Sequence, residues 1–412
     1  MTAQILSISW SIILLLVFIY LIAKQSQIKF FHNRNSLLLV LAIGLFVRLV
    51  PAFFFETGTN FDIESYKLVS EHVVNFEDVY TAEDTINRHP YLPFQMYWMG
   101  AANLISNKLA ISFSAIVKIF PILADCLVSL LLFLIIVNTK DKQTALFGAL
   151  LYAVNPISVF VSAYHGQFGA IPILFILLTI YTLEKNKFIS GVALGFGVLN
   201  KSWPILFFPI TWTKLSSMKE KMFFTTAMLI SPGIGVLIYS ILYDARIFTV
   251  IKRAVMYSHG IGVWGYTYFI KMLGIYSPGI SPFVWDYFGV AKFVTIAILA
   301  LIWYKFARHK KVSEGFLLIL ISFFAFTHAF SIQYLVWIVP FAILSFDYHW
   351  LKLYTLGAFS YMFLVYNTLI NHFYINNIMS WPEADLLIII PASLPVWFVT
   401  LFWFINKIKQ PD

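Results

Sequence analysis

Two carboxylates lie close together soon after a long apolar run. Asp62 and Glu64 belong to the segment Asp-Ile-Glu, which follows the apolar run 37–55. A carboxylate that is partly shielded from water can take the proton of an attacking hydroxyl group and so act as a general base. The same residues can also form a helix cap with a solvated neighbour, because aspartate is a good N-cap. The spacing alone leaves both interpretations open.

A second group of polar residues is basic. Arg246, Lys252, Arg253 and His259 lie before and within a stretch rich in glycine and aromatic residues, 257–266. Cations beside apolar rings suit a phosphate carried on a lipid, because charge binds the head and the rings contact the chain. Snorkelling of the same side chains to ordinary lipid headgroups explains the pattern equally well.

Three further polar residues interrupt apolar stretches. Lys201 stands between the short apolar runs 188–200 and 203–213, where an unpaired charge is costly inside a membrane. This cost favours a functional role for Lys201. His165 and Gln167 can hydrogen-bond sugar hydroxyls or a phosphate, or they can satisfy backbone groups that a broken helix leaves exposed.

The composition of the chain indicates a membrane protein. Of the 412 residues, 60% are hydrophobic and 11% are charged, and the mean hydropathy is +0.82. No soluble core of this size needs so much apolar surface. The basic residues are scattered in short clusters between apolar runs, so the net charge of +9 indicates membrane topology and no nucleic-acid partner. We predict a single all-α polytopic membrane domain over residues 1–412.

Other features narrow the class. Cys126 is the only cysteine, which excludes a disulfide framework and a cysteine-based metal site. Residues 1–23 lack the basic start and the cleavage site of a signal peptide, so we expect 5–23 to be retained as a helix. The sequence contains no glycine-rich phosphate loop, no His-Glu-x-x-His helix and no Gly-x-Ser-x-Gly elbow, and therefore no known motif for ATP hydrolysis.

The apolar runs predict a bundle of about 11–13 transmembrane helices, several of them short or broken. The predicted spans are 5–23, 37–55, 115–137, 144–163, 168–183, 188–200, 203–213, 222–242, 285–304, 315–330, 333–346, 353–370 and 386–405. The runs 188–200, 203–213 and 333–346 are too short to cross about 30 Å of hydrocarbon upright. We therefore expect them to be broken or paired elements that meet inside the protein.

The distribution of basic residues orients these spans. Alternate connections place 17 of the 28 Lys and Arg residues on one side and 8 on the other, with 3 inside spans. The positive-inside rule then puts the N-terminus outside and the C-terminus in the cytoplasm. The long loops 56–114 and 244–284 face outward, so we expect the active site on the non-cytoplasmic side. Asp62 is expected to cap an amphipathic surface helix in the first loop.

Several segments resemble membrane glycosyltransferases of the GT-C superfamily. The segments 62–71, 78–80 and 88–93 are similar to the first outer loop of the catalytic subunit of GPI mannosyltransferase I. Four later segments resemble, in the same order, parts of bacterial family 87 mannosyltransferases: 155–156, 165–168, 200–204 and 333–340. The chain departs from these patterns at Glu64, which replaces a second aspartate, and at Gly169, where such enzymes often have an acid.

The resemblance implies a GT-C-like bundle and an inverting transfer of one hexose, most directly mannose, from a polyprenyl-phosphate donor to a lipid-linked or glycan acceptor. It implies no nucleotide sugar, no cofactor and no metal, because Arg and Lys can stabilise a lipid-phosphate leaving group. Asp62 is then the general base, with Glu64 beside it. The donor phosphate and sugar are expected to bind to Lys201, Arg246, Lys252, Arg253, His259, His165, Gln167, Arg88, His89 and Gln333.

The resemblance to bacterial family 87 enzymes favours a bacterial plasma membrane over the endoplasmic reticulum, whereas the resemblance of the first loop argues for the endoplasmic reticulum. The competing prediction is a transporter or flippase of a lipid-linked glycan, which also contains broken helices and buried charges. Transporters usually place such charges near the midplane of a repeated architecture, whereas this sequence shows no repeat and gathers its charges on one face. These features favour an enzyme. A non-catalytic scaffold is a third interpretation, and a transfer assay on the purified chain would distinguish it.

Overall fold

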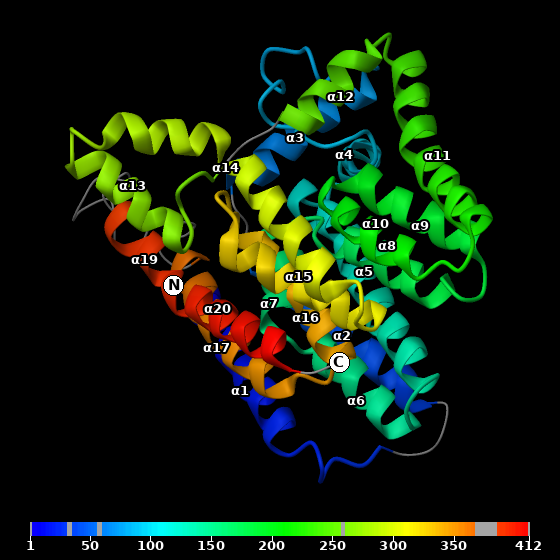
Figure 1. Ribbon diagram of the computed structural model, residues 1–412. Coiled ribbons are helices and arrows are strands. Elements are labelled where there is room, and N and C mark those ends of the chain that lie inside the picture. Colours follow the sequence, from blue (N-terminus) through cyan, green and yellow to red (C-terminus); the bar gives the residue numbers. More distant parts are fainter. Residues whose placement is uncertain (1, 31–34, 56–59, 257–259, 367–384, 411–412) are drawn as a thin grey trace. The chain divides into compact units, whose positions relative to one another are not determined.

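The computed structural model describes residues 2–30, 35–55, 60–256, 260–366 and 385–410. Within these ranges the chain forms helices joined by loops, with one isolated β-bridge between Ile261 and Ala329. The predicted all-α class is therefore confirmed. The chain divides into two compact units, Met1–Tyr257 and Ser258–Asp412, and each is described by itself (Figure 1). The division falls inside the basic loop 244–284.

The first unit contains α1 to α12. Their bounds are α1 Thr2–Ala23, α2 Asn35–Phe54, α3 Asn60–Val74, α4 Gln95–Leu109, α5 Phe113–Val137, α6 Lys142–Ala153, α7 Pro156–Val159, α8 Ala170–Thr182, α9 Lys187–Asn200, α10 Phe208–Thr213, α11 Met218–Leu242 and α12 Ile247–Met256. A π-helical segment, Phe160–His165, continues α7, and a 3-10 turn, Trp203–Phe207, precedes α10.

The described residues include six helices that are long and apolar enough to cross a membrane. They are Ile5–Ala23, Asn35–Phe54, Phe113–Val137, Met218–Leu242, Ser281–Ala307 and Leu386–Lys409. A seventh span forms if Lys142–Ala153 and Pro156–His165, which are bent by 44° at their junction, count as one. Shorter apolar helices occur at Ala170–Thr182, Lys187–Asn200, Val312–Phe326 and Ile332–Leu344. The chain is therefore an integral multi-pass membrane protein with several short or broken apolar helices.

The bend between α6 and α7 follows from two residues. Pro156 has no backbone N–H, so it cannot continue the hydrogen-bonded helix but suits the first turn of a new one. Asn155 caps this new helix, because its Oδ1 accepts hydrogen bonds from the backbone N–H groups of Ile157 and Ser158 at 3.0 and 3.4 Å. The Asn-Pro pair therefore sets the direction of the π-helical segment that follows.

Two glycines let α9 approach α11 closely. A Cβ on Gly191 would lie 2.4 Å from the carbonyl oxygen of Phe224, and one on Gly195 would lie 2.3 Å from that of Met228. Small residues allow such close contact between helix backbones, which is a common way to pack helices in membranes. This contact fixes the position of α9, whose last residue precedes Lys201.

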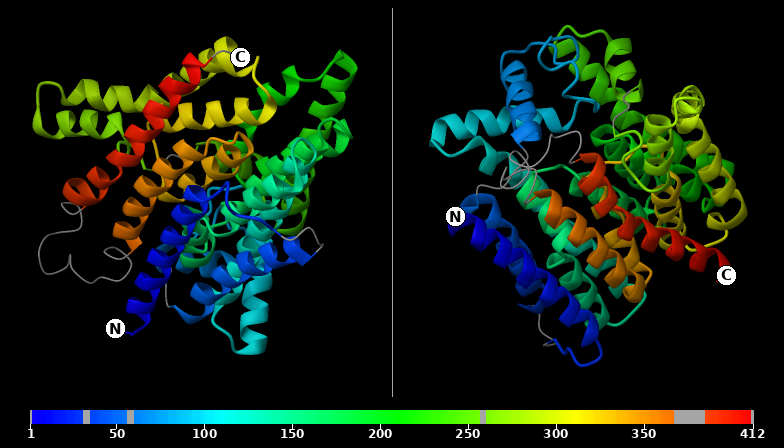
Figure 2. Two further views of the ribbon diagram at one scale, coloured as in Figure 1. Left: turned by 90° about the horizontal axis from the view of Figure 1, so that it is seen from below. Right: turned by 90° about the vertical axis from the view of Figure 1, so that its left-hand side faces the viewer.

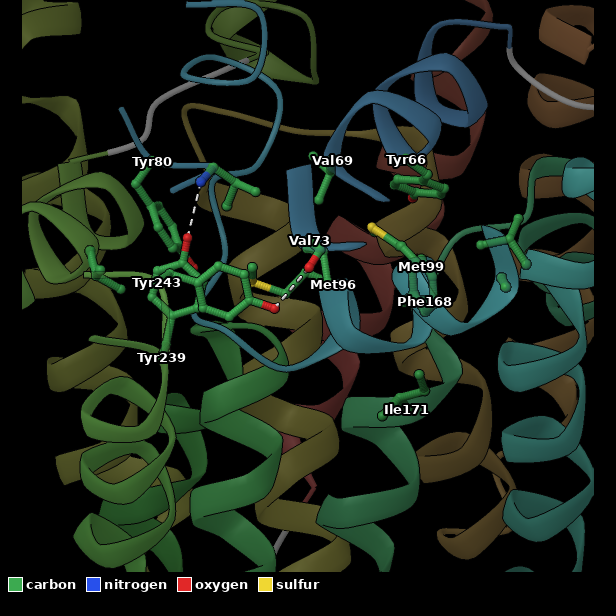
Figure 3. Packing of buried hydrophobic residues seen from close by; sticks show 14 of the residues in the cluster. Tyr66, Val69, Val73, Tyr80, Met96, Met99, Phe168, Ile171, Tyr239 and Tyr243 are labelled. Atoms are coloured by element: carbon green, nitrogen blue, oxygen red, sulfur yellow. Dashed lines mark hydrogen bonds between the residues drawn. The ribbon is translucent and has the colours of Figure 1, made fainter. Parts of the chain in front are cut away.

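The loop 56–114 contains an amphipathic helix, α3, as predicted. Tyr66, Val69 and Val73 of α3 are buried in an apolar cluster that also contains residues of α4 and α11 (Figure 3). At the other end of this cluster the backbone N–H of Val79 donates to the hydroxyl of Tyr239 at 3.0 Å. The loop 56–114 is thus packed onto the helices of the first unit over its described part.

The second unit contains α13 Tyr266–Tyr276, α14 Ser281–Ile302, α15 Val312–Phe326, α16 Ile338–Leu344, α17 Tyr348–Val365, α19 Ile390–Ala392 and α20 Leu394–Lys409. α20 packs against α15 and α17, and α17 and α20 lie side by side in both views of Figure 2. Trp264 is fully buried, stacks on Phe330 with ring centroids 3.6 Å apart, and donates from Nε1 to the carbonyl of Phe324. Trp264, a residue of the stretch 257–266, therefore belongs to the core of this unit.

Candidate functional site

The carboxylate of Asp62 is held by two side chains that follow it by 103 and 105 residues. His165 Nε2 lies 2.5 Å from Asp62 Oδ2, and Gln167 Nε2 donates to the same oxygen at 2.7 Å. Contact with a carboxylate places a proton on Nε2 of the histidine. The side chain of Asp62 is 26% exposed, and within the described residues no hydrogen bond reaches its Oδ1. One oxygen is therefore fixed while the other is available.

The turn at Gly166 brings both partners to Asp62. Gly166 has a φ of 80°, a left-handed conformation that glycine adopts readily. A Cβ at this position would lie 3.0 Å from Cγ of Lys118 and 3.2 Å from Cδ1 of Ile63. Both the conformation and the space therefore favour glycine. His165 ends the π-helical segment on one side of the turn, and Gln167 follows on the other.

Lys201 joins this group through Gln167. Its Nζ donates to Gln167 Oε1 at 3.3 Å and lies 5.0 Å from the ring centroid of Tyr91. The side chain is buried just beyond the end of α9. Burial lowers the pKa of Lys201 to about 8, although the negative charge of Asp62 opposes this shift. The structure thus brings together Asp62, His165, Gln167 and Lys201, and we call these four residues the Asp62 network.

Asp62 stays ionised in this setting. Burial alone would raise the pKa of its carboxyl group, but the hydrogen bonds from His165 and Gln167 and the charges of His165 and Lys201 lower that pKa to about 2. The expected N-cap role of Asp62 is wrong, because α3 begins two residues earlier, at Asn60, and places Asp62 in its first turn. Glu64 is exposed and makes no described contact with the network.

Arg88 and His89 lie near the network without bonding to it. Arg88 Nη1 donates to Ser65 Oγ at 3.1 Å, and its guanidinium carbon lies 5.0 Å from the ring centroid of Phe61. The ring of His89 is buried between Tyr80 and Tyr91, at 5.7 and 5.8 Å. Burial lowers the pKa of His89 to about 3, so its neutral ring can hydrogen-bond but cannot supply a charge to a phosphate.

The other predicted donor contacts lie elsewhere. Arg246 and Lys252 are exposed and Arg253 is half-buried, all on or beside α12, and within the described residues no hydrogen bond or ion pair joins them to the Asp62 network. Gln333 belongs to the second unit, where its Oε1 accepts a hydrogen bond from Ser331 Oγ. His259 lies outside the described residues.

Sequence reasoning missed a pair of buried amides beside Lys201. Asn200 Nδ2 donates to Gln95 Oε1 at 3.4 Å, and both side chains are fully buried. Among the described residues, Gln95 Nε2 and Asn200 Oδ1 have no partner. The available signal was Asn200 itself, a polar residue at the end of an otherwise apolar run. Tyr91, whose ring lies beside the Lys201 ammonium, belongs to the segment 88–93 that carried the resemblance, but it was not named as a site residue.

A second buried charge network lies within the helices of the first unit. Arg48 Nε donates to Asp125 Oδ2 at 2.9 Å, and Tyr152 Oη donates to Asp125 Oδ1 at 2.5 Å. Arg48 Nη1 also donates to the carbonyls of Gly44 and Ala153, and its Nη2 donates to Ser158 Oγ. The side chains of Arg48 and Asp125 are both 0% exposed. Both carboxylate oxygens and all three guanidinium nitrogens have partners, which is typical of a structural ion pair.

The described residues contain no group of three or more His, Cys, Asp or Glu side chains that could hold a metal ion. For the Asp62 network itself, the ligands that the geometry offers are the Asp62 carboxylate oxygen, the Gln167 amide group and the Lys201 ammonium group. Such a set suits hydroxyl groups and an anion.

No protein-family profile matches the chain, and no curated protein matches its sequence. The chain is weakly similar to solved structures of the oligosaccharyltransferase of Archaeoglobus fulgidus. The complex with Zn and sulfate has 17% identity and a TM-score of 0.44, and the match covers 90% of this chain and 53% of that one. The apo form has 14% identity and a TM-score of 0.44, with coverages of 92% and 56%.

The form tethered to an acceptor peptide containing the NVT sequon has 13% identity and a TM-score of 0.42, again with coverages of 92% and 56%. The chain therefore spans about half the length of these enzymes. Likeness at this level assigns no activity to the chain.

Proposed function

We propose that the chain is a membrane glycosyltransferase that transfers a hexose from a polyprenyl-phosphate donor to a lipid-linked or glycan acceptor. One observation carries this proposal: Asp62 is held at Oδ2 by His165 and Gln167, while its Oδ1 has no described partner. The ammonium group of Lys201 lies on the far side of Gln167. A base and a cation thus share one hydrogen-bonded network.

Asp62 is the general base of this proposal. The acceptor oxygen attacks the anomeric carbon of the donor, the bond between that carbon and the phosphate oxygen breaks, and the hydroxyl proton passes to Asp62 Oδ1. As the new bond forms, the hydroxyl oxygen gains positive charge and its proton becomes strongly acidic. A carboxylate with a pKa of about 2 can therefore accept it, and it is already ionised at neutral pH.

Lys201 is the cation that stabilises the leaving phosphate. The phosphate oxygen gains negative charge as the glycosidic bond breaks, and a cation that is already in place lowers the energy of this state. With a pKa of about 8, most Lys201 side chains are protonated at neutral pH. Arg88, which packs on Phe61 beside Asp62, is the nearest further candidate for donor contact.

The finer identity of the substrates rests on the sequence resemblance. It favours mannose as the sugar, a bacterial plasma membrane as the location and a reaction without a cofactor. The decisive experiment incubates the purified chain with labelled polyprenyl-phosphate mannose or glucose and a lipid extract, and follows transfer of the label. Transfer from mannose and not from glucose is the expected result. Absence of transfer from either donor would overturn the proposal.

The side of the membrane is tested separately. Glu77 is exposed in the first outer loop, and the only native cysteine, Cys126, can be replaced by alanine. Glu77→Cys in that background is expected to react with an impermeant thiol reagent on intact cells. Labelling that requires permeabilised cells would place the loop, and the Asp62 network with it, in the cytoplasm.

A further inference from the structure

We propose that α12 lies in the plane of the membrane surface and binds anionic phospholipid headgroups through Arg246 and Lys252. This inference does not depend on the proposed transferase activity. It concerns a surface for which the sequence allowed two interpretations, donor binding and contact with lipid headgroups. The argument rests on which side chains of α12 are exposed, on where the helix begins and on the charges along its edge.

One face of α12 is apolar and exposed. Ile247, Phe248, Ile251 and Val255 are 44%, 75%, 44% and 56% exposed. At 3.6 residues per turn they fall on one side of the helix. Val250 points the other way and is fully buried in the apolar cluster of the first unit. α12 is therefore attached to the protein along one side and presents large apolar side chains along another.

The position of α12 in the chain places it at the surface of the membrane. It follows α11, a 25-residue candidate span that is long enough to cross about 30 Å of hydrocarbon. Asp244 has a left-handed φ of 48°, and the N–H of Ala245 bonds to the carbonyl of Ser240 at 3.1 Å, so the chain turns immediately after α11. Figure 1 shows α12 leaving the upper end of α11.

The cations of α12 border this apolar face. Arg246 immediately precedes the helix and Lys252 lies one turn after Phe248, and both side chains are exposed. Neither makes a hydrogen bond or ion pair within the described residues. An in-plane helix with apolar side chains directed into the bilayer and cations at the headgroup level is attracted to anionic lipids. Phosphate headgroups complement both the charge and the apolar face.

Anionic lipid headgroups fit the cations of α12 better than the phosphate of the reacting donor does. A donor phosphate must reach the anomeric carbon beside Asp62, and the cation bonded within the Asp62 network is Lys201. Exposed cations on the edge of an apolar face are instead open to any lipid that diffuses past. Each such cation contributes about fivefold to the preference for anionic over zwitterionic lipid.

The test places a fluorophore on the exposed face of α12. Phe248→Cys is labelled in the Cys126→Ala background of the full-length chain and reconstituted in equimolar phosphatidylcholine and phosphatidylglycerol. Quenching by doxyl-labelled phosphatidylglycerol is compared with quenching by the matching phosphatidylcholine. We expect phosphatidylglycerol to quench preferentially. Arg246→Gln and Lys252→Gln should each lower this preference about fivefold, and high salt should lower it further.

Lys219→Gln is the matched control. Lys219 is also an exposed cation but lies at the opposite end of α11, so the preference at residue 248 should not change. Equal quenching by both lipids would overturn the role of the cations. Absence of quenching by either lipid would show that protein, either the second unit or another copy of the chain, covers α12. If Arg246→Gln and Lys252→Gln instead lower kcat/KM for the donor in pure phosphatidylcholine, the cations belong to the donor site and the inference is wrong.

Discussion

The first unit contains two buried charge networks that differ in completeness. Around Arg48 and Asp125, both carboxylate oxygens are engaged and the guanidinium group donates to a carboxylate, two carbonyls and a hydroxyl. Around Asp62, one carboxylate oxygen accepts two hydrogen bonds and the other accepts none from the described residues. The Asp62 network therefore keeps a carboxylate oxygen that could accept a hydrogen bond from a ligand, whereas both oxygens of Asp125 are already bonded.

The difference also separates the two functional classes that fit the sequence. A transporter needs ionisable groups near the middle of its spans that can change partners. Arg48 and Asp125 lie within spans, but they are already fully satisfied by each other and by the backbone. The Asp62 network is built from helix ends and loops instead. This difference supports the proposed transferase over a transporter.

The largest expected effect is loss of catalysis on removal of the Asp62 base. Asp62→Asn keeps the size of the side chain and removes its basicity, so transfer should fall about 100-fold or more. Thermal stability should change little, because the amide can still accept hydrogen bonds from His165 and Gln167. Initial rates and a thermal melt of the reconstituted protein measure both quantities.

Glu64→Gln is the control for this prediction. Glu64 is exposed outside the network, so its replacement should reduce transfer far less. If Glu64→Gln abolishes transfer while Asp62→Asn remains active, the two carboxylates have the opposite roles.

Disruption of the complete network around Arg48 and Asp125 should lower the stability of the protein. Arg48→Met leaves the carboxylate of Asp125 buried without its cation, which should cost about 3–5 kcal/mol of unfolding free energy. The double variant Arg48→Met with Asp125→Leu should recover most of this loss, because replacing a whole buried ion pair by apolar residues is often neutral. Unfolding in bicelles measures both. A single variant as stable as the double one would show that the pair is not needed for folding.

The activity that depends on the Asp62 network should change with pH through Lys201. Its pKa of about 8 means that the ammonium group loses its charge as the pH rises through that value. The kcat/KM for the donor should therefore fall about tenfold per pH unit above this point. Lys201→Arg should keep its activity to higher pH, because arginine stays charged. An alkaline limb at the same pH in both proteins would assign the titration to another group.

The smallest expected effect is that of Tyr152→Phe, which should change stability and leave the kinetics unchanged. Tyr152→Phe removes the hydroxyl that donates to Asp125 Oδ1 and should cost about 1–3 kcal/mol of stability. Donor KM and the pH profile of the folded protein should stay as they are. A change in the pH profile would mean that the complete network communicates with the site.

The sequence was informative where a polar residue interrupted an apolar run or came soon after one. Asp62, His165, Gln167 and Lys201 were each candidates, and the structure brings all four together. Their association could not be read from the sequence, because it depends on a turn at Gly166 and on the packing of α9 against α11. Likewise the lengths of the apolar runs predicted short or broken helices. The partners of Arg48 and Asp125 could not be predicted in this way, because they depend on how separate helices pack.

Two features of the loops depend on local geometry. Glu64 was grouped with Asp62, but residues two apart on a helix do not face the same way, and α3 includes both. Trp264 belongs to the stretch 257–266, whose rings suit a lipid phosphate by composition, and it stacks in the core of the second unit. Aromatic residues in a loop serve packing and binding equally well, and composition alone does not separate these uses.

The π-helical segment Phe160–His165 makes the site sensitive to the number of residues in the chain. A π-helical turn holds one residue more than the α-helical hydrogen-bond pattern requires. Deletion of one residue between Phe160 and Ala163 would let the segment wind as an ordinary α-helix and would keep His165 near its present angle around the axis. Insertion of a residue into a regular helix instead advances the chain by about 100° around the axis, so one residue more in this segment would turn His165 away from Asp62. Such an insertion would dismantle the site while every one of its side chains remained in the sequence.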